Sequence, residues 1–187
     1  MEFNIRLKLV GTLIMAALLS SACQSFIPHA QGLSSPSWVA QSYQRQDQIE
    51  VQWNNNSFSF LLYQQQNDKK LDMVALSLTG QQLFKLNFDG EKVVVEQRIN
   101  QMKLLPFEYV VRDLLYATYP NFEQQQKDQV NVVVEDSRQK IFIKNSHVLD
   151  IDKKDDVVEL KNVQVPYEMV ISAVSESLEN DEDSNAQ

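Results

Sequence analysis

Glycine, histidine and cysteine are scarce in this chain of 187 residues, which holds four glycines, two histidines and one cysteine. So few glycines exclude the glycine-rich loops that cradle phosphates, and no G-x-S-x-G motif presents a serine nucleophile. Neither His29 nor His147 has a cysteine or histidine partner at ligand spacing, so no metal site is predicted. We therefore expect no catalytic residue, no cofactor and no enzymatic activity.

An excess of basic residues is also missing. The chain carries 17 lysines and arginines against 25 aspartates and glutamates, which gives a formal charge of −8. Such a chain repels phosphate backbones, and no basic stripe compensates, so nucleic-acid binding is excluded. The 43% hydrophobic and 22% charged residues are typical of a globular protein, and the length allows one ordinary domain.

No apolar run reaches the length of about 20 residues that a membrane-spanning helix needs. Arg6 and Lys8 precede a shorter apolar stretch, Leu9 to Leu19, which is followed by small residues up to Ala22. This order is typical of a secretory signal peptide, which we assign to residues 1–22.

The single cysteine, Cys23, follows at once. In an exported protein a lone cysteine cannot form an internal disulfide, so it is free, paired with another chain or modified. The stretch "LLSSACQS" resembles the lipobox of bacterial lipoproteins. That resemblance implies cleavage before Cys23 and a diacylglycerol on its thiol. Ser20 stands where the usual pattern has leucine, and the small residues also suit ordinary signal peptidase, which would leave a free thiol. Both outcomes stay open.

The lipobox resemblance also implies a location. Gln24 is not the aspartate that retains such proteins in the inner membrane of Gram-negative bacteria, so the outer membrane, on its periplasmic face, is expected. Residues 23–36 are small and polar and predict a lipidated N-terminus with a flexible tether. Ser35 could cap a short helix that begins at Pro36 and continues through Trp38 and Tyr43.

Apolar residues alternate with polar ones from Ile49 to Arg98, and turn signals such as Asn54-Asn55-Asn56 and Asp89-Gly90 interrupt the alternation. This pattern predicts an antiparallel meander of five strands. Their expected ranges are 48–54, 57–64, 70–78, 82–88 and 92–98.

The periodicity becomes helical at "LPFEYVVRDLLYATYP", residues 105–120. Five apolar residues fall on one face of this helix, namely Phe107, Val110, Val111, Leu114 and Leu115. Glu108 and Arg112 lie four residues apart on the other face, in the order that favours an ion pair. Asp113 also points away from the apolar face. Pro120 ends the helix, which we expect to cover or plug the sheet.

Strand patterns return after a Gln-rich loop at residues 123–129. Five more strands are expected near 130–134, 141–143, 148–151, 157–160 and 167–174. About ten strands in runs, with one main helix, predict an α+β fold in which an antiparallel sheet forms a half-open barrel. Residues 37–176 form the single domain, and residues 177–187 form an acidic disordered tail.

Large side chains are expected to point inward from this sheet. These side chains either fill the core completely or line a cavity for an acyl chain at the mouth of the barrel. The cavity hypothesis assigns nine ligand-binding residues, which are Trp53, Phe58, Phe60, Phe84, Phe107, Val110, Val111, Leu114 and Leu115.

The order of elements, with "LSLTGQQLFKLNFDGEKVVVE", the helix at residues 105–120 and "LKNVQVPYEMVIS", resembles an uncharacterised family of bacterial outer-membrane lipoproteins often encoded beside aryl-polyene or fatty-acid-like biosynthetic genes. That family in turn resembles LolA and LolB, the periplasmic carrier and outer-membrane receptor of lipoproteins, whose half-open barrel is capped by helices. The resemblance spans residues 49–174 and is most specific at residues 105–120, Asn162 and Tyr167.

The LolB-like resemblance implies a monomeric lipoprotein that is anchored to the membrane by its lipid and binds, receives or transfers a lipid, a lipoprotein or another acylated molecule. A non-catalytic scaffold of an envelope assembly with a packed core is the alternative. An envelope hydrolase with His147 as its base is a third and weaker hypothesis.

Overall fold

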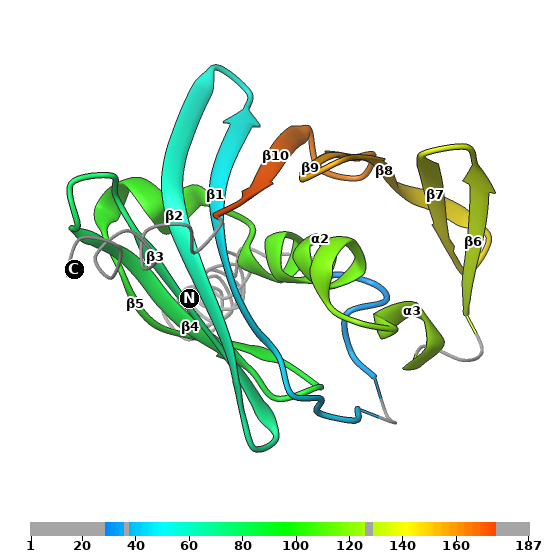
Figure 1. Ribbon diagram of the computed structural model, residues 1–187, viewed down its shortest axis with the longest axis horizontal. Helices are drawn as coiled ribbons and strands as arrows, with labels where there is room; N and C mark the ends of the chain where they lie inside the picture. The colour runs from blue at the N-terminus through cyan, green and yellow to red at the C-terminus, as the bar shows by residue number, and fades with distance from the viewer. Residues whose placement is uncertain (1–28, 36–37, 126–128, 175–187) are drawn as a thin grey trace, which may run out of the picture.

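The fold is built on one antiparallel sheet of ten strands, in the order β5-β4-β3-β2-β1-β10-β9-β8-β7-β6 (Figure 1). The computed structural model describes residues 29–35, 38–125 and 129–174. The strands are β1 (Gln44–Trp53), β2 (Asn56–Asn67), β3 (Lys70–Leu76), β4 (Gln82–Phe88), β5 (Val93–Arg98), β6 (Val130–Glu135), β7 (Arg138–Ile143), β8 (Ser146–Lys154), β9 (Val157–Asn162) and β10 (Tyr167–Ala173). The ten predicted antiparallel strands are confirmed.

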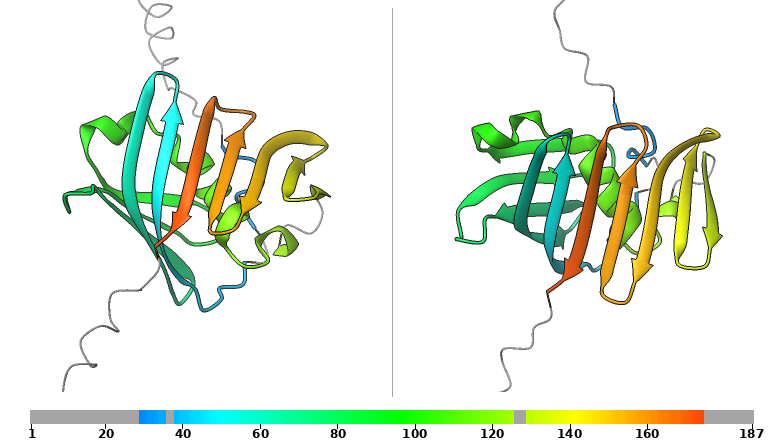
Figure 2. Two further views of the ribbon diagram at one scale, coloured as in Figure 1. Left: turned by 45° about the horizontal axis from the view of Figure 1, so that its top comes forward. Right: turned by 90° about the horizontal axis from the view of Figure 1, so that it is seen from above.

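Two meanders make up this sheet. β1 to β5 form the first and β6 to β10 the second, and they join where β1 pairs with β10, Ile49 opposite Ile171. Tight turns connect the strands because residues that tolerate positive φ stand at them, including Asn54 at 51° and Asp68 at 50°. The sheet curves, but β5 and β6 do not pair with each other, so the barrel stays open (Figure 2).

The main helix, α2 (Phe107–Thr118), lies on the concave face of the sheet and contacts β5 and β9, which come from the two meanders. The helix predicted at residues 105–120 is therefore confirmed. Its Phe107 ring packs edge-on against Phe84, with centroids 5.0 Å apart, and Phe84 packs in turn against Phe60 at 5.6 Å. No helix among the described residues is long and apolar enough to span a bilayer.

Two short helices flank α2, a 3₁₀ turn η1 (Asn100–Leu104) and α3 (Phe122–Gln125). α3 occupies part of the stretch that the sequence predicts as a loop at residues 123–129. Its Phe122 is fully buried and packs against Tyr116 at 4.9 Å. The burial of one aromatic ring against α2 thus fixes a turn of helix in a segment whose glutamines predict only a polar loop.

The predicted helix after Ser35 is wrong, because Trp38 to Tyr43 are not helical. The Val39 N–H donates to Gln125 Oε1 at 3.0 Å, and the Gln41 N–H donates to the Tyr119 hydroxyl at 2.9 Å. These backbone groups are therefore bonded to distant side chains rather than to a helical turn.

The predicted tether is also wrong where the structure describes it. Residues 29–35, which we call the N-terminal strap, lie along α2, and both Ala30 and Leu33 are at most 1% exposed. Ser35 is likewise buried, and its N–H donates to the carbonyl of Gly90 at 2.9 Å. Residues 23–28, the signal peptide and the acidic tail lie outside the described residues.

Candidate functional site

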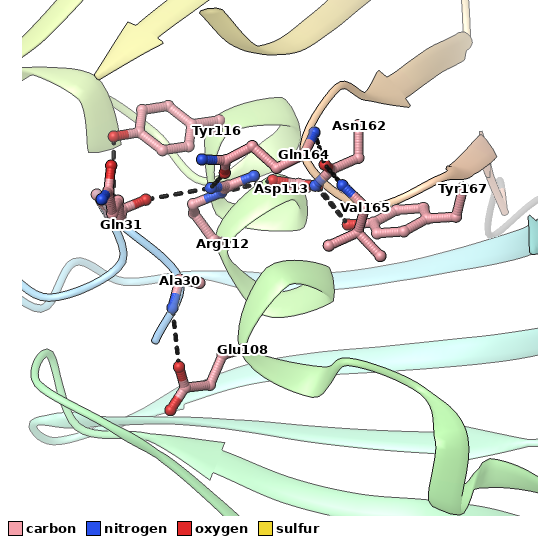
Figure 3. A network of polar contacts seen from close by, with 11 residues as sticks. Ala30, Gln31, Glu108, Arg112, Asp113, Tyr116, Asn162, Gln164, Val165 and Tyr167 are labelled. Atoms are coloured by element: carbon pink, nitrogen blue, oxygen red, sulfur yellow. Dashed lines mark hydrogen bonds and ion pairs between the residues drawn. The ribbon is translucent and has the colours of Figure 1, made fainter. Parts of the chain in front are cut away.

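The polar side of α2 carries a buried ion pair rather than an exposed one. Arg112 and Asp113 are both 0% exposed, and Arg112 Nε lies 2.7 Å from Asp113 Oδ1. The Glu108–Arg112 ion pair that the sequence spacing favours is therefore not formed, since Glu108 lies 2.8 Å from His29 instead. Arg112 pairs with its neighbour instead because the β9–β10 turn and the strap cover this side of the helix (Figure 3).

Asp113 is the centre of a closed hydrogen-bond cluster. Its Oδ2 accepts from Asn162 Nδ2 at 2.6 Å and from the Tyr167 hydroxyl (Figure 3). Asn162 Oδ1 in turn accepts from two backbone N–H groups of the β9–β10 turn, those of Gln164 and Val165, each at 2.7 Å. The cluster therefore fixes this turn to the helix.

Burial is the main cause of the pKa shifts in this cluster. Burial raises the pKa of Asp113, and the Arg112 guanidinium opposes that shift, followed by the hydrogen bond from Tyr167. Burial and the adjacent Asp113 carboxylate raise the pKa of Tyr167 well above its usual value. Because Arg112, Asp113 and Tyr167 are at most 2% exposed, no substrate can reach them, and the cluster acts as a clamp rather than as a reactive site.

Three side chains of α2 hold the backbone of the N-terminal strap. Glu108 Oε2 accepts from the Ala30 N–H at 3.0 Å, Arg112 Nη1 donates to the carbonyl of residue 31 at 3.2 Å, and the Tyr116 hydroxyl donates to the Gly32 carbonyl at 3.1 Å (Figure 3). Positions 108, 112 and 116 lie four residues apart and so form one stripe along the helix. Successive turns of α2 thus bind successive residues of the strap.

Seven of the nine predicted ligand-binding residues are closed inside the core. Each is at most 6% exposed, so none lines a cavity open to a water-sized molecule in this conformation. They are Phe60, Phe84, Phe107, Val110, Val111, Leu114 and Leu115. The other two, Trp53 and Phe58, are half-buried and line a separate surface pocket of about 230 Å³ together with Gln101 and Leu104.

A larger pocket of about 430 Å³ lies between the C-terminal end of α2 and the concave side of the β6–β8 end of the sheet. We call it the helix–edge pocket. Its apolar lining includes Val132, Val134 and Ile141 from the sheet and Tyr116 and Pro120 from the helix side.

Polar side chains complete the lining of the helix–edge pocket. They include Glu123, Gln139 and Lys153. Lys154, next to Lys153, lies 3.2 Å from Asp152, whereas Lys153 has no carboxylate within 4.0 Å among the described residues. The pocket therefore combines an apolar wall with an available cation.

Sequence reasoning missed the helix–edge pocket. The alternation of Val130, Val132 and Val134 predicts that they share one face of a strand, but not which element covers that face. Tyr116 was missed too, because it lies one position beyond the apolar stripe of the helix. Only the topology, which brings β6 opposite the end of α2, joins these residues.

The histidines occupy separate positions. His147 Nε2 lies 2.8 Å from Asp150 Oδ1, and its ring stacks on Phe142 at 5.0 Å. His29 Nδ1 lies 2.8 Å from Glu108 Oε2 at the start of the strap. Among the described residues no three His, Cys, Asp or Glu side chains gather as a metal site would require, and Cys23 lies outside that part of the chain.

Residues 44–175 match the model of the family described as "Protein of unknown function (DUF3261)", and this range covers the whole sheet and α2. Among curated proteins, none matches the chain.

Proposed function

We propose that this protein, which belongs to the DUF3261 family, is a non-catalytic outer-membrane lipoprotein that binds the acyl part of a lipid or lipidated molecule in the helix–edge pocket. The observation that carries the proposal is the pocket itself, about 430 Å³ on the concave side of a sheet that does not close. Ligand sites in proteins commonly occupy about 300–1,000 Å³ and often lie at barrel mouths.

The lining favours an amphipathic ligand. Val132, Val134 and Ile141 offer apolar contact to a hydrocarbon chain, and Lys153 offers a cation to a carboxylate or phosphate at one end of it. The resemblance to LolA and LolB supports the same reading, since those proteins carry acylated cargo in a half-open barrel. On this proposal the cargo enters beside β6 rather than along the whole apolar face of α2.

The location rests on Cys23. We propose that Cys23 bears a diacylglycerol and that the mature chain faces the periplasm from the outer membrane. Each buried CH₂ contributes about 0.8 kcal/mol, so two or three acyl chains give stable anchoring where one is marginal. Intact mass spectrometry of the membrane-extracted protein tests this point. A mature chain that begins at Cys23 without an added diacylglycerol would refute the anchor but not the pocket.

Binding is tested with a fluorescent fatty acid and a fluorescent lipopeptide. Val134 is 61% exposed, so Val134→Glu leaves the core intact but places a charge in the pocket wall. Loss of the valine contact costs about 1–2 kcal/mol, so we expect binding about 5–30-fold weaker. Val94→Glu is the matched control, because Val94 is 40% exposed on the opposite edge strand β5. Absence of saturable binding by the parent protein would refute the proposal.

The second candidate is a scaffold lipoprotein of an envelope assembly. The closed core favours it, since the apolar face of α2 is filled by aromatic contacts such as Phe84–Phe107 at 5.0 Å. The scaffold hypothesis predicts a stable protein partner and no saturable binding of either probe, so Val134→Glu should change nothing in the binding assay. The carrier predicts probe binding without a partner, so the same pair of variants separates the two functions.

A further inference from the structure

The outer edge of β6 is open in the part of the chain that the structure describes. β6 pairs only with β7, and Figures 1 and 2 show no other described element beside it. The strand reads VNVVVE, without the proline or lysine that commonly protects an edge, and its register with β7 has no bulge. By contrast, the other edge, β5, pairs with β4 through a register shift at Lys85/Leu86.

The hydrogen-bond pattern shows which backbone groups the open edge offers. Lys144 N donates to Gln129 O at 2.8 Å, so residues 129 and 144 form a hydrogen-bonded pair. Such pairs alternate along an antiparallel ladder, so residues 131, 133 and 135 also bond to β7. Glu135 opposite Arg138 is accordingly the hydrogen-bonded pair that closes the hairpin turn. Val130, Val132 and Val134 therefore direct their N–H and C=O groups away from β7, to the free edge.

We propose that this edge binds the same edge of a second copy of the chain, so that two sheets continue into one across a two-fold axis. Residues that oppose each other in such a pair must lie on the same face of the sheet. A two-fold axis through Val132 meets this requirement, because it pairs each residue with one an even number of positions away. In that register Val132 faces Val132 of the partner subunit and Val130 faces the partner's Val134. Those are the residues whose backbone groups are free to pair.

The other face of the strand and the local charge agree with this register. Asn131 faces the partner's Val133, and Glu135 faces the partner's Gln129, so no like charges are opposed. The β6–β7 hairpin, residues 130–143, carries Glu135 and Asp136 against Arg138 and Lys140 and is neutral, whereas the whole chain carries −8. Self-association through this hairpin is therefore less opposed by charge than the net charge of the chain suggests.

The expected dimer is weak in solution. A single strand pair buries much less than the ~1,600 Å² of a standard interface, so its population rises with protein concentration. On this proposal the chain forms a concentration-dependent dimer, whereas the LolB-like resemblance implies a monomer. Its other possible occupant, an extended peptide of a different protein, would use the same backbone groups but not the same symmetry.

Disulfide trapping tests the register in the full chain. Paired residues in a hydrogen-bonded antiparallel pair have Cα atoms about 5.5 Å apart, within the range of a disulfide. Val132→Cys on the axis should therefore form a disulfide-linked product of twice the chain mass in oxidised cell envelopes. Val134→Cys is the matched control, since its symmetry mate lies four residues away, beyond the ~7 Å limit for bridging. The parent chain controls for Cys23.

The outcomes are separable. A dimer from Val132→Cys, with monomer from Val134→Cys and from the parent chain, supports the proposal. Equal linking at both positions, no linking at either, or a product of another mass overturns it. If the cysteine variants fold poorly, sedimentation of Val132→Lys, Val132→Glu and their equal mixture replaces them. Each alone should be monomeric and the mixture dimeric; a mixture that stays monomeric also refutes the proposal.

Discussion

Substitution of Gly32 by alanine tests whether the N-terminal strap is an integral part of the domain. Gly32 has φ of 75°, and a Cβ at this position would lie 2.2 Å from Ile143 Cδ1 and 3.2 Å from the Tyr116 hydroxyl. The left-handed backbone costs a non-glycine residue about 1–2 kcal/mol. The overlap adds about 1–3 kcal/mol, as overpacked cores do. We therefore expect Gly32→Ala to lower the free energy of unfolding by about 2–5 kcal/mol.

Gly80→Ala is the matched control, because Gly80 has φ of 85° and no atom within 4 Å of the added Cβ. It should cost only the backbone contribution of about 1–2 kcal/mol. Ile143→Val removes the Cδ1 atom that the new Cβ would meet, so the double variant with Gly32→Ala should be more stable than the sum of the single effects predicts. Urea unfolding of the four variants measures these differences. If Gly32→Ala costs no more than Gly80→Ala, the strap is not packed as described, and the predicted flexible tether would be the better account.

Two further substitutions test the charged groups. Asp113→Ala leaves the Arg112 guanidinium buried without its counter-ion, so we expect a loss of about 3–5 kcal/mol in urea unfolding; a loss below 1 kcal/mol would contradict the closed cluster. Asp89 Oδ1 accepts from the backbone N–H groups of Lys92 at 2.9 Å and Glu91 at 3.0 Å, and these bonds, chiefly that of Lys92, lower its pKa below the usual value. Because the folded-state pKa is lowered, the stabilisation of the fold by the ionised Asp89 carboxylate is present above the usual aspartate pKa. It is lost as the pH falls through the folded-state value. Asp89→Ala should therefore cost about 0.5–1.5 kcal/mol at neutral pH and much less in acid, and an equal cost at both would contradict the assignment.

The regular parts of the fold could be predicted from the sequence because their causes are local. Strand ranges follow from the two-residue period and from turn residues such as Asn54 and Asp68, and the bounds of α2 follow from its apolar stripe and Pro120. A sheet that stays open also agrees with the prediction of a half-open barrel. These patterns depend on residues within a few positions of one another.

The features that could not be predicted depend on contacts between distant residues. The strap contains small and polar residues typical of a tether, and only its docking on α2 buries Ala30 and Leu33. Arg112 and Asp113 carry the charges of a solvated helix face, yet the β9–β10 turn covers them through Asn162. No local pattern specifies which segment will cover a polar face, so the sequence predicts a flexible tether and a polar helix face without predicting that the two meet.

α2 is held from both sides, and this limits where a ligand can bind. Its apolar stripe is closed against the sheet, while Glu108, Arg112 and Tyr116 bind the strap. A ligand that reached the predicted cavity under Phe107 would have to displace the helix, break these hydrogen bonds and expose Leu33 and Ala30 to water. The helix–edge pocket requires none of these changes, because it is already open between the last turn of α2 and the β6–β8 end of the sheet. Tyr116 is common to both features, since it lines the pocket while its hydroxyl donates to the Gly32 carbonyl. An acyl chain should therefore bind there without unfastening the strap, so protease sensitivity of the strap should be the same with and without bound probe.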